Sequence, residues 1–292
     1  MIVVTAPTGN IGSQVLAHLL DSGEPLRVVA RDPSKLPAET RRRVEVIEGS
    51  HSQQDVVLRA FDGADRVFWL VPGDPRAASA EAAYVDFARP GCDAMQRCGV
   101  KQVVGISALG RGWPKEAGHV TATLKMDDLV ASTGVAYRAL ACSSLMENLL
   151  RQVVPIRDQG VFFCSSPADF KLPFCATRDA AALSARLLLD RSWSGVEAIP
   201  MMGPEDLSGN DMARIMTEVL GKPVRCQEIG TEDLRKTMLG RGASAGMAQA
   251  MVEMFVAKNE GMDHLVARPA PNPAPTGFRQ WCEMLLKPVV EA

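Results

Sequence analysis

The sequence is poor in tyrosine, in metal-binding patterns and in long hydrophobic runs. Only two of its 292 residues are tyrosines, and aromatic residues make up 5% of the chain. No apolar run reaches the ~20 residues that a membrane-spanning helix needs. The four histidines lie far apart, without the short spacing of a metal site. These absences indicate a globular protein that holds no metal and has no role in a membrane.

The cysteines show no pairing pattern. There are seven, an odd number, scattered along the chain without a Cys-x-x-Cys pair. We therefore expect reduced thiols in a cytoplasmic protein and no disulfide framework. The chain also starts with a strand-like segment at Ile2 in place of a signal peptide.

Charge gives no sign of a polyanionic partner. The net charge is −2, which predicts no direct binding to nucleic acid or to an anionic membrane. The one basic run, three arginines at 41–43, is too short to indicate DNA binding. We interpret it as a solvated junction between a helix and a strand.

Strand-like and helix-like segments alternate through the first half of the chain. Near-continuous apolar strands separated by helices are typical of a parallel sheet covered on both faces, which here predicts an α/β, Rossmann-type doubly wound fold. The expected strands are 2–5, 26–30, 44–47, 66–71, 102–106 and 136–141, and the expected helices are 11–22, 52–61, 79–98 and 119–133.

The pattern changes after about residue 142. Helices dominate from there, which predicts a nucleotide-binding domain over 1–141 and a smaller, mainly helical substrate-side lobe over 142–292, with an approximate boundary because the chain crosses back to the sheet. The proline-rich stretch 267–275 is expected to be an extended strap. The expected helices are 179–191, 208–220, 231–240, 244–258 and 276–286, with short strands at 161–164, 196–201 and 224–228.

The first strand runs directly into a glycine turn and an amphipathic segment. Such a turn brings backbone N–H groups and a helix N-terminus to the pyrophosphate of a dinucleotide. The first glycine of the usual three is absent, since alanine stands at position 6. The residues expected to bind the cofactor here are Ala6, Thr8, Gly9, Asn10, Ile11 and Gly12.

The end of the second predicted strand bears on the choice of cofactor. Arg31 follows that strand and Lys35 comes four residues later. Basic residues there accommodate the 2′-phosphate of NADP, which favours NADP(H) over NAD(H). Asp32 leaves two interpretations open, because its carboxylate either bonds a ribose or caps the next turn. Two further strand ends, at Val71–Pro72 and at Ser107, are expected to face the cofactor.

Several stretches together resemble the NmrA-like branch of the atypical short-chain dehydrogenases/reductases. They are Thr-Ala-Pro-Thr-Gly-Asn-Ile-Gly from Thr5, Ala-Arg-Asp-Pro-Ser-Lys from Ala30, Cys-Gly-Val-Lys-Gln-Val-Val from Cys98 and Gly-Pro-Glu-Asp-Leu-Ser from Gly203. The resemblance implies an NAD(P)-binding domain, a smaller C-terminal lobe and a cleft between them. Some members of this family are reductases of quinones or dyes, and others are regulators that bind the dinucleotide with little chemistry.

The catalytic motif of ordinary short-chain dehydrogenases, Tyr-x-x-x-Lys, is incomplete here. Lys125 is in place, but Thr121 stands where the tyrosine would be, and a threonine hydroxyl is too weak an acid to replace a phenol. Lys125 either contacts the nicotinamide ribose or is a surface lysine. His119 is a candidate proton donor, although a surface or N-cap histidine fits as well. Ser107 keeps the position of the serine.

Residues of the second half, most of them apolar, are candidates for a substrate wall, although a place in the core also fits each of the apolar ones. As a set they suggest an apolar substrate. The candidates are Met146, Asn148, Phe162, Phe163 and Met251.

Two hypotheses follow for the function. The first is an NADPH-dependent oxidoreductase that delivers hydride to an apolar conjugated acceptor, such as a quinone, enone, imine or dye, without the usual catalytic tyrosine. The second is a non-catalytic sensor of NAD(P)(H) that acts through a protein partner. A small apolar substrate is the expected partner, and a homodimer or a regulatory protein partner is compatible with either hypothesis.

Overall fold

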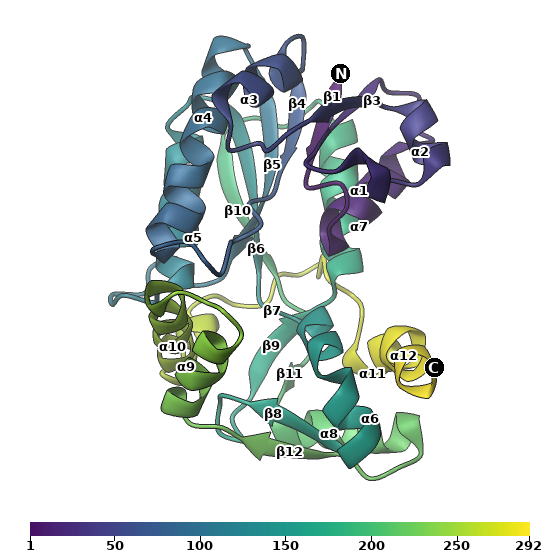
Figure 1. Cartoon of the computed structure of the whole chain (residues 1–292), viewed down its shortest axis with the longest axis vertical. Coiled ribbons are helices and arrows are strands. Elements are labelled where there is room, and N and C mark those ends of the chain that lie inside the picture. Colours follow the sequence, from purple (N-terminus) through teal and green to yellow (C-terminus); the bar gives the residue numbers. More distant parts are fainter. The chain divides into compact units, whose positions relative to one another are not determined.

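Seven strands form the main sheet of the protein, in the first of its two units (Figure 1). The computed structural model describes residues 1–292. The first unit comprises Met1–Ala108, Ala122–Ala141 and Ala180–Ile199, and the second comprises Leu109–Thr121, Cys142–Asp179 and Pro200–Ala292.

The sheet has the strand order β10-β6-β5-β4-β1-β2-β3. The pairs β1·β2, β1·β4, β2·β3 and β4·β5 are parallel, which confirms the predicted doubly wound sheet. Its strand order reverses between β1 and β4, the point where such sheets bind ligands. The strands are β1 (Ile2–Thr5), β2 (Leu26–Ala30), β3 (Glu45–Glu48), β4 (Arg66–Trp69), β5 (Gln102–Ala108), β6 (Ala136–Cys142) and β10 (Val196–Met201).

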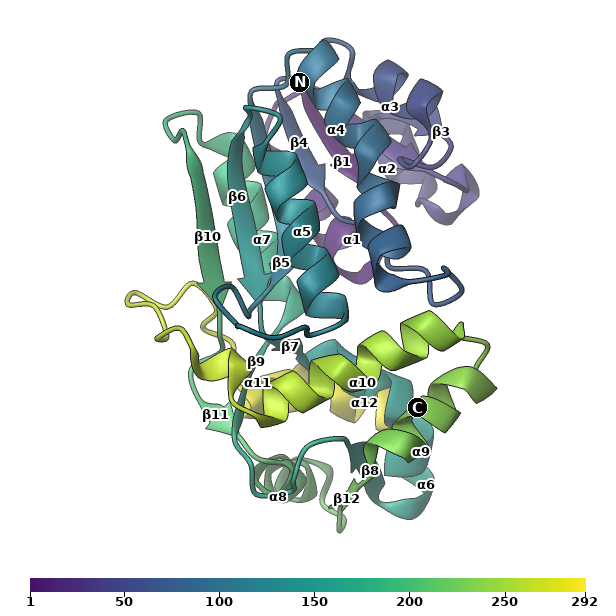
Figure 2. The same cartoon turned by 90° about the vertical axis from the view of Figure 1, so that its left-hand side faces the viewer.

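Helices cover both faces of this sheet (Figures 1 and 2). Helices α3, α4 and α5 lie on one face, and α1 and α7 lie on the other. Strands β1 and β4 are buried throughout, as a sheet covered on both faces requires. The helices are α1 (Asn10–Leu19), α2 (Ala38–Arg43), α3 (Gln54–Phe61), α4 (Phe87–Arg97), α5 (His119–Ala131) and α7 (Thr177–Leu189).

The chain returns to the first unit with α7 and β10, so the units are not the two continuous ranges predicted from the sequence, although a crossing back to the sheet was expected. Strand β10 lies beside β6 and covers an edge that would otherwise expose unpaired backbone groups. Buried Arg66 fastens the end of α7 to the sheet, because its guanidinium donates to the Leu188 carbonyl (2.5 Å) and pairs with Glu24 (2.7 Å). Conversely, Leu109–Thr121 belongs to the second unit.

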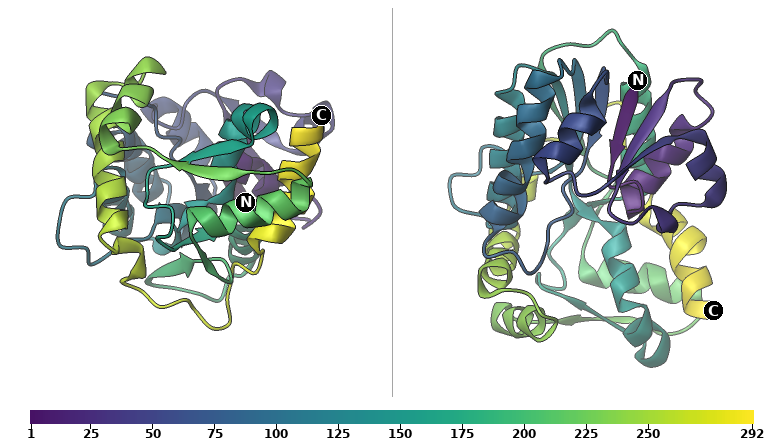
Figure 3. Two further views of the ribbon diagram at one scale, coloured as in Figure 1. Left: turned by 90° about the horizontal axis from the view of Figure 1, so that it is seen from below. Right: turned by 45° about the horizontal axis from the view of Figure 1, so that its top comes forward.

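The second unit has two small sheets and its own core. Parallel β8 and β12 form one sheet (Figure 3), and β11, β9 and β7 form the other. The prediction missed β7, β9, β11 and α6, because these segments are short and lack a clear hydrophobic period. The elements are β7 (Ser144–Leu145), α6 (Val153–Gln159), β8 (Val161–Cys164), β9 (Leu172–Cys175), β11 (Asp206–Leu207), α8 (Gly209–Leu220), β12 (Arg225–Glu228), α9 (Thr231–Gly240), α10 (Ala245–Asn259), α11 (Phe278–Trp281) and α12 (Lys287–Glu291).

No helix in the structure is long and apolar enough to cross a membrane. The three arginines at 41–43 end α2 and are exposed just before β3, which confirms their interpretation as a solvated junction.

Candidate dinucleotide site

The glycine turn between β1 and α1 is built around Ala6. This residue has a φ of +49°, the left-handed conformation that glycine adopts without cost, so an alanine here carries strain. The Gly9 N–H donates to the Ala6 carbonyl (3.1 Å) and closes the turn. A Cβ on Gly12 would lie 2.1 Å from the same carbonyl oxygen, so only glycine lets α1 start this close to the turn.

The N-terminus of α1 is suited to an anion. Gly9 is its N-cap and supplies no side-chain hydrogen bond, and no acidic residue lies in the first turn. The first backbone N–H groups of a helix have no partner within the helix, and the helix dipole favours negative charge there. Thr8, Gly9 and Asn10 are exposed, whereas Ile11 is buried in the core. The turn therefore fits the pyrophosphate of a dinucleotide.

The ends of β1 and β4 are locked together. The Thr5 hydroxyl donates to the Phe68 carbonyl (2.9 Å) and accepts from the Leu70 N–H (3.0 Å). These two hydrogen bonds hold the backbone in place just before Val71 and Pro72. Val71 is buried in the core and Pro72 is half-buried. The loop after β4 is thus held at the strand end next to the glycine turn.

His51 braces the same loop from the neighbouring side, a role that sequence reasoning missed. Its Nε2–H donates to the Leu70 carbonyl (2.9 Å), and its ring lies edge-on to Trp69 and Phe87. Burial lowers the pKa of His51 to about 4, with a smaller contribution from the charge of Arg31, so the ring is neutral at physiological pH. The only signal in the sequence was its place shortly after the third strand.

The basic residues after β2 remain accessible, and the acidic one is engaged. Arg31 and Lys35 are exposed. Asp32 accepts hydrogen bonds from the Ser34 hydroxyl (2.6 Å) and the Ser34 N–H (3.0 Å), which lower the pKa of its carboxyl. Of the two interpretations of Asp32, the structure therefore shows the local cap.

Lys125 and Ser107 lie in the first unit, each with a partner. The Lys125 ammonium is half exposed and lies 3.5 Å from Glu81, a surface ion pair that constrains it little. Ser107, near the end of β5, is buried and donates its hydrogen bond to Asp127 of α5. Asp127 was not predicted, although it comes two residues after Lys125.

Thr121 and His119, at the start of α5, have local roles. The Thr121 hydroxyl accepts from the Ala117 N–H (2.8 Å). His119 is 8% exposed, which corrects the expectation of a surface histidine. Burial lowers its pKa, and a hydrogen bond to the Met247 backbone offsets part of that shift. Its depressed pKa and its burial in the second unit make His119 a poor proton donor.

The candidates for a substrate wall divide into core and surface. Met146 and Phe162 are each 2% exposed and pack in the core of the second unit, which favours their alternative reading. Asn148 is exposed, and Phe163 and Met251 are half-buried, so a role at a substrate stays a prediction for these three. The neighbouring Glu147 is structural, because it accepts from the Thr177 N–H (3.0 Å) and from the Trp281 indole (3.1 Å).

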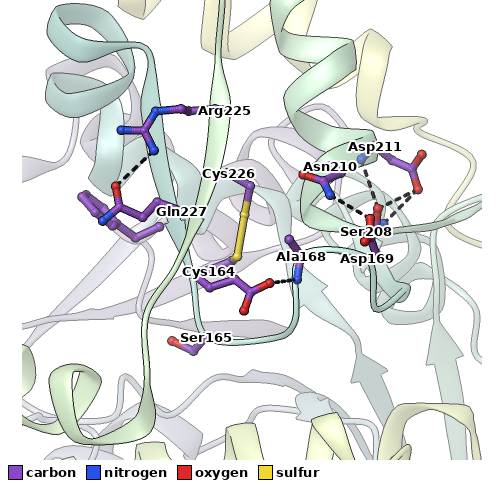
Figure 4. Close-up of a disulfide and its surroundings, with 12 residues drawn as sticks. Cys164, Ser165, Ala168, Asp169, Ser208, Asn210, Asp211, Arg225, Cys226 and Gln227 are labelled. Atoms are coloured by element: carbon purple, nitrogen blue, oxygen red, sulfur yellow. Dashed lines mark hydrogen bonds between the residues drawn. A yellow bond between two sulfur atoms is a disulfide. The ribbon is translucent and has the colours of Figure 1, made fainter.

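The expectation of reduced thiols throughout was wrong at one pair. Cys164 of β8 and Cys226 of β12 form a disulfide, with their Cα atoms 6.6 Å apart (Figure 4). The two strands are parallel, and Cys226 lies opposite Phe162, two residues before Cys164 on β8. This pairing brings the two cysteines close together, although they are 62 residues apart in sequence. The other five cysteines are free, and burial raises the pKa of Cys92 and Cys282 to about 12.

Two curated relatives align with most of the chain. An NAD(P)H azoreductase of Xenophilus azovorans is 28% identical over 256 residues, which cover 87% of this chain and 86% of the relative. A (4-alkanoyl-5-oxo-2,5-dihydrofuran-3-yl)methyl phosphate reductase of Streptomyces griseus is 27% identical over 295 residues, covering 96% of each.

Solved structures share the fold at lower identity. An NADPH-dependent quinone oxidoreductase of Escherichia coli, complexed with NADPH, has a TM-score of 0.78 at 20% identity and covers 100% of this chain and 99% of its own. A triphenylmethane reductase of Citrobacter sp., complexed with NADP(H), has a TM-score of 0.77 at 17% identity, covering 96% and 98%.

The family itself is shown by a match over residues 7–161, which include Gly9 and Gly12 of the glycine turn and the strands β2 to β6. The match is to the NAD(P)H-binding family, and it spans more than half of the chain. Together with the strained turn at Ala6 and the uncapped start of α1, it establishes this chain as a member of the NAD(P)H-binding family.

Proposed function

We propose that this protein is an NADPH-dependent reductase of apolar conjugated acceptors such as azo dyes and quinones. The observation that carries the proposal is the site itself: a turn that fits a dinucleotide pyrophosphate, with Thr121 in place of a catalytic phenol. When bound, the reduced nicotinamide supplies a hydride. The protein binds and orients the cofactor and the acceptor, and it excludes water from them.

Because the site lacks a phenol, we expect acceptors that can be reduced without a proton from a side chain of the protein. The Thr121 hydroxyl is both a weak acid and engaged with the Ala117 N–H, and His119 is buried with a lowered pKa. A quinone or a cationic dye accepts hydride without simultaneous protonation by the protein. A relative of this chain is named an NAD(P)H azoreductase, and a protein of the same fold is named an NADPH-dependent quinone oxidoreductase, which supports acceptors of these classes.

Turnover with a panel of acceptors tests the proposal. We expect NADPH consumption with at least one azo dye, quinone or triphenylmethane dye, and no more than background with simple ketones, which need an acid. Tight NADPH binding without turnover on any acceptor would contradict the reductase and support the non-catalytic sensor that the missing phenol also fits.

NADP(H) is the proposed cofactor because of the charges after β2. Arg31 and Lys35 are exposed there, while the Asp32 carboxylate is held by Ser34. Replacing Arg31 with glutamine should weaken NADPH binding by about tenfold or more, since a charge-assisted hydrogen bond contributes about 1.5–3 kcal/mol, and leave NADH binding unchanged. Isothermal titration with both cofactors measures this change.

Arg41→Gln is the matched control for this variant. Arg41 is also an exposed arginine, but it lies on α2 and does not follow β2 directly as Arg31 does. It should leave both affinities unchanged. An Arg31→Gln variant that binds NADPH as tightly as the wild type would overturn the proposed preference.

A further inference from the structure

Three buried polar side chains in the first unit form one hydrogen-bonded group. Asp127 of α5 accepts from the Tyr137 hydroxyl of β6 (2.6 Å) through Oδ1 and from the Ser107 hydroxyl of β5 through Oδ2. Their exposed fractions are 3%, 1% and 6%, respectively. Asp127 and Tyr137 are not part of the usual catalytic motif of this family, and their spacing in the sequence did not indicate that they meet.

The backbone of β5 is adapted to this group. A Cβ on Gly105 would lie 2.3 Å from the Tyr137 hydroxyl oxygen, so glycine at this position makes room for the tyrosine. Gly105 and Ser107 are two residues apart on one strand and therefore face the same side of the sheet. The tyrosine thus passes over Gly105 to reach Asp127, which in turn contacts Ser107.

This arrangement determines the hydrogen-bonding polarity of Ser107. A serine hydroxyl has one proton to donate and two lone pairs, and an ionised carboxylate can only accept. Since Ser107 donates its proton to Asp127, it can only accept from any other group. Ser107 therefore cannot donate a hydrogen bond to a substrate carbonyl.

The position of Ser107 relative to the cofactor follows from the sheet. The glycine turn follows β1 and the basic residues follow β2, which assigns the adenosine half to the side of β2 and β3. The nicotinamide half then lies over the ends of β4 and β5. Ser107 is the last residue but one of β5.

We propose that Asp127, braced by Tyr137, fixes Ser107 as a hydrogen-bond acceptor for the carboxamide N–H of the bound nicotinamide. The inference rests on the proposed function only in so far as a nicotinamide dinucleotide binds here. Ser107 is then a cofactor-binding residue, and Asp127 and Tyr137 are positioning residues that act through it.

The 3-acetylpyridine analogue of NADP⁺ tests this polarity, because it keeps the carbonyl oxygen but lacks the N–H donor. We expect the wild type to bind NADP⁺ about tenfold more tightly than the analogue, the effect of one unsatisfied hydrogen bond. Isothermal titration gives both dissociation constants without any substrate.

Two variants separate polarity from packing. Ser107→Ala removes the acceptor and should bring the ratio of the two dissociation constants close to one. Asp127→Asn places an amide donor beside Ser107, so the serine accepts from the amide and its own proton turns toward the cofactor. The ratio of the two dissociation constants should therefore also fall, while the analogue binds at least as tightly as it does to the wild type. Ser132→Ala, which removes an exposed hydroxyl just after α5, should keep the wild-type ratio.

Equal affinities in the wild type, or a wild-type ratio in Ser107→Ala, would overturn the inference. A purely structural role would weaken both ligands alike and leave the ratio unchanged, and that result also contradicts it. The proposed function is tested separately. If the protein shows the expected ratio of dissociation constants but reduces no acceptor, this inference holds and the proposal of a reductase is wrong.

Discussion

Ala6 is the residue at which this site departs most from the usual glycine pattern. Its φ of +49° shows that the fold keeps the left-handed turn even where the sequence has lost the glycine that adopts it without cost. A non-glycine residue in this region costs about 1 kcal/mol or more, so the surrounding structure must impose the turn. The hydrogen bond from Gly9 and the close approach of Gly12 impose it.

Replacing Gly12 with alanine tests this packing. The new Cβ would meet the Ala6 carbonyl at 2.1 Å, and a backbone atom cannot yield as a flexible side chain can. We expect a loss of about 1–3 kcal/mol in the free energy of unfolding and no measurable NADPH binding. Urea unfolding and isothermal titration measure the two effects.

Gly9→Ala is the matched control. Gly9 has an ordinary φ of −86°, and its added Cβ would lie at a normal 3.5 Å from the Ala6 oxygen. This variant should therefore fold as stably as the wild type, and any loss of NADPH affinity would report crowding of the pyrophosphate. Equal destabilisation by both substitutions would refute the steric account.

At the scale of elements, α4 shows how a helix adapts to the strand beneath it. A wider π turn at Ala82–Asp86 precedes it, and Pro90 lies within it. Proline removes a backbone donor from a helix, and π turns are one way in which helices absorb such interruptions. The next residue, Gly91, lies directly against the ring of Trp69 in β4.

Gly91→Ala should destabilise the first unit by about 1–3 kcal/mol, because a Cβ would lie 2.3 Å from the Trp69 ring and overpack the core. Adding Trp69→Phe removes the ring atoms in conflict, together with an indole N–H that is buried without a partner. The double variant should be more stable than Gly91→Ala alone, as measured by thermal unfolding. If the effects of the two substitutions on thermal stability were additive, the new methyl group at position 91 would not be in direct contact with the Trp69 ring.

At the scale of the whole molecule, the chain order and the two units do not coincide. Residues 180–199 return to the first unit, and residues 109–121 leave it for the second. Each unit has its own hydrophobic core. The disulfide between Cys164 and Cys226 lies wholly within the second unit and joins two of its strands (Figure 4).

The stability of the protein should fall in mild acid because of His51. Burial lowers its folded pKa from 6.5 to about 4, so between these values the unfolded chain binds more protons than the folded one. The stabilisation is complete above about pH 6.5 and is lost as the pH falls, which costs about 2 kcal/mol at about pH 5. Urea unfolding at about pH 7.5 and about pH 5 measures this loss.

His51→Gln should remove most of that pH dependence. Glutamine does not titrate, and its amide can donate to the Leu70 carbonyl as the His51 ring does. His18→Gln, which changes an exposed histidine of α1, is the matched control and should keep the wild-type pH dependence. A His51→Gln protein that loses as much stability in acid as the wild type would show that His51 is not responsible.

Much of the first unit could be predicted because its signals are local. Strands β1 and β2 have the predicted bounds, since runs of β-branched residues and glycine stops depend only on neighbours in sequence. The cofactor turn and the cap formed by Asp32 were likewise within reach of local chemistry. The short strands of the second unit were not, because pairing partners supply their stability.

Local signals in the sequence suffice to predict the parallel sheet and the glycine turn, and they place a threonine in the position of the phenol at residue 121. Contacts between distant residues depend on tertiary packing: Asp127 with Ser107 and Tyr137, His51 with the Leu70 carbonyl, and Cys164 with Cys226. Periodicity and turn chemistry act over only a few residues. A buried hydrogen bond or a disulfide depends instead on the packing that brings its two ends together.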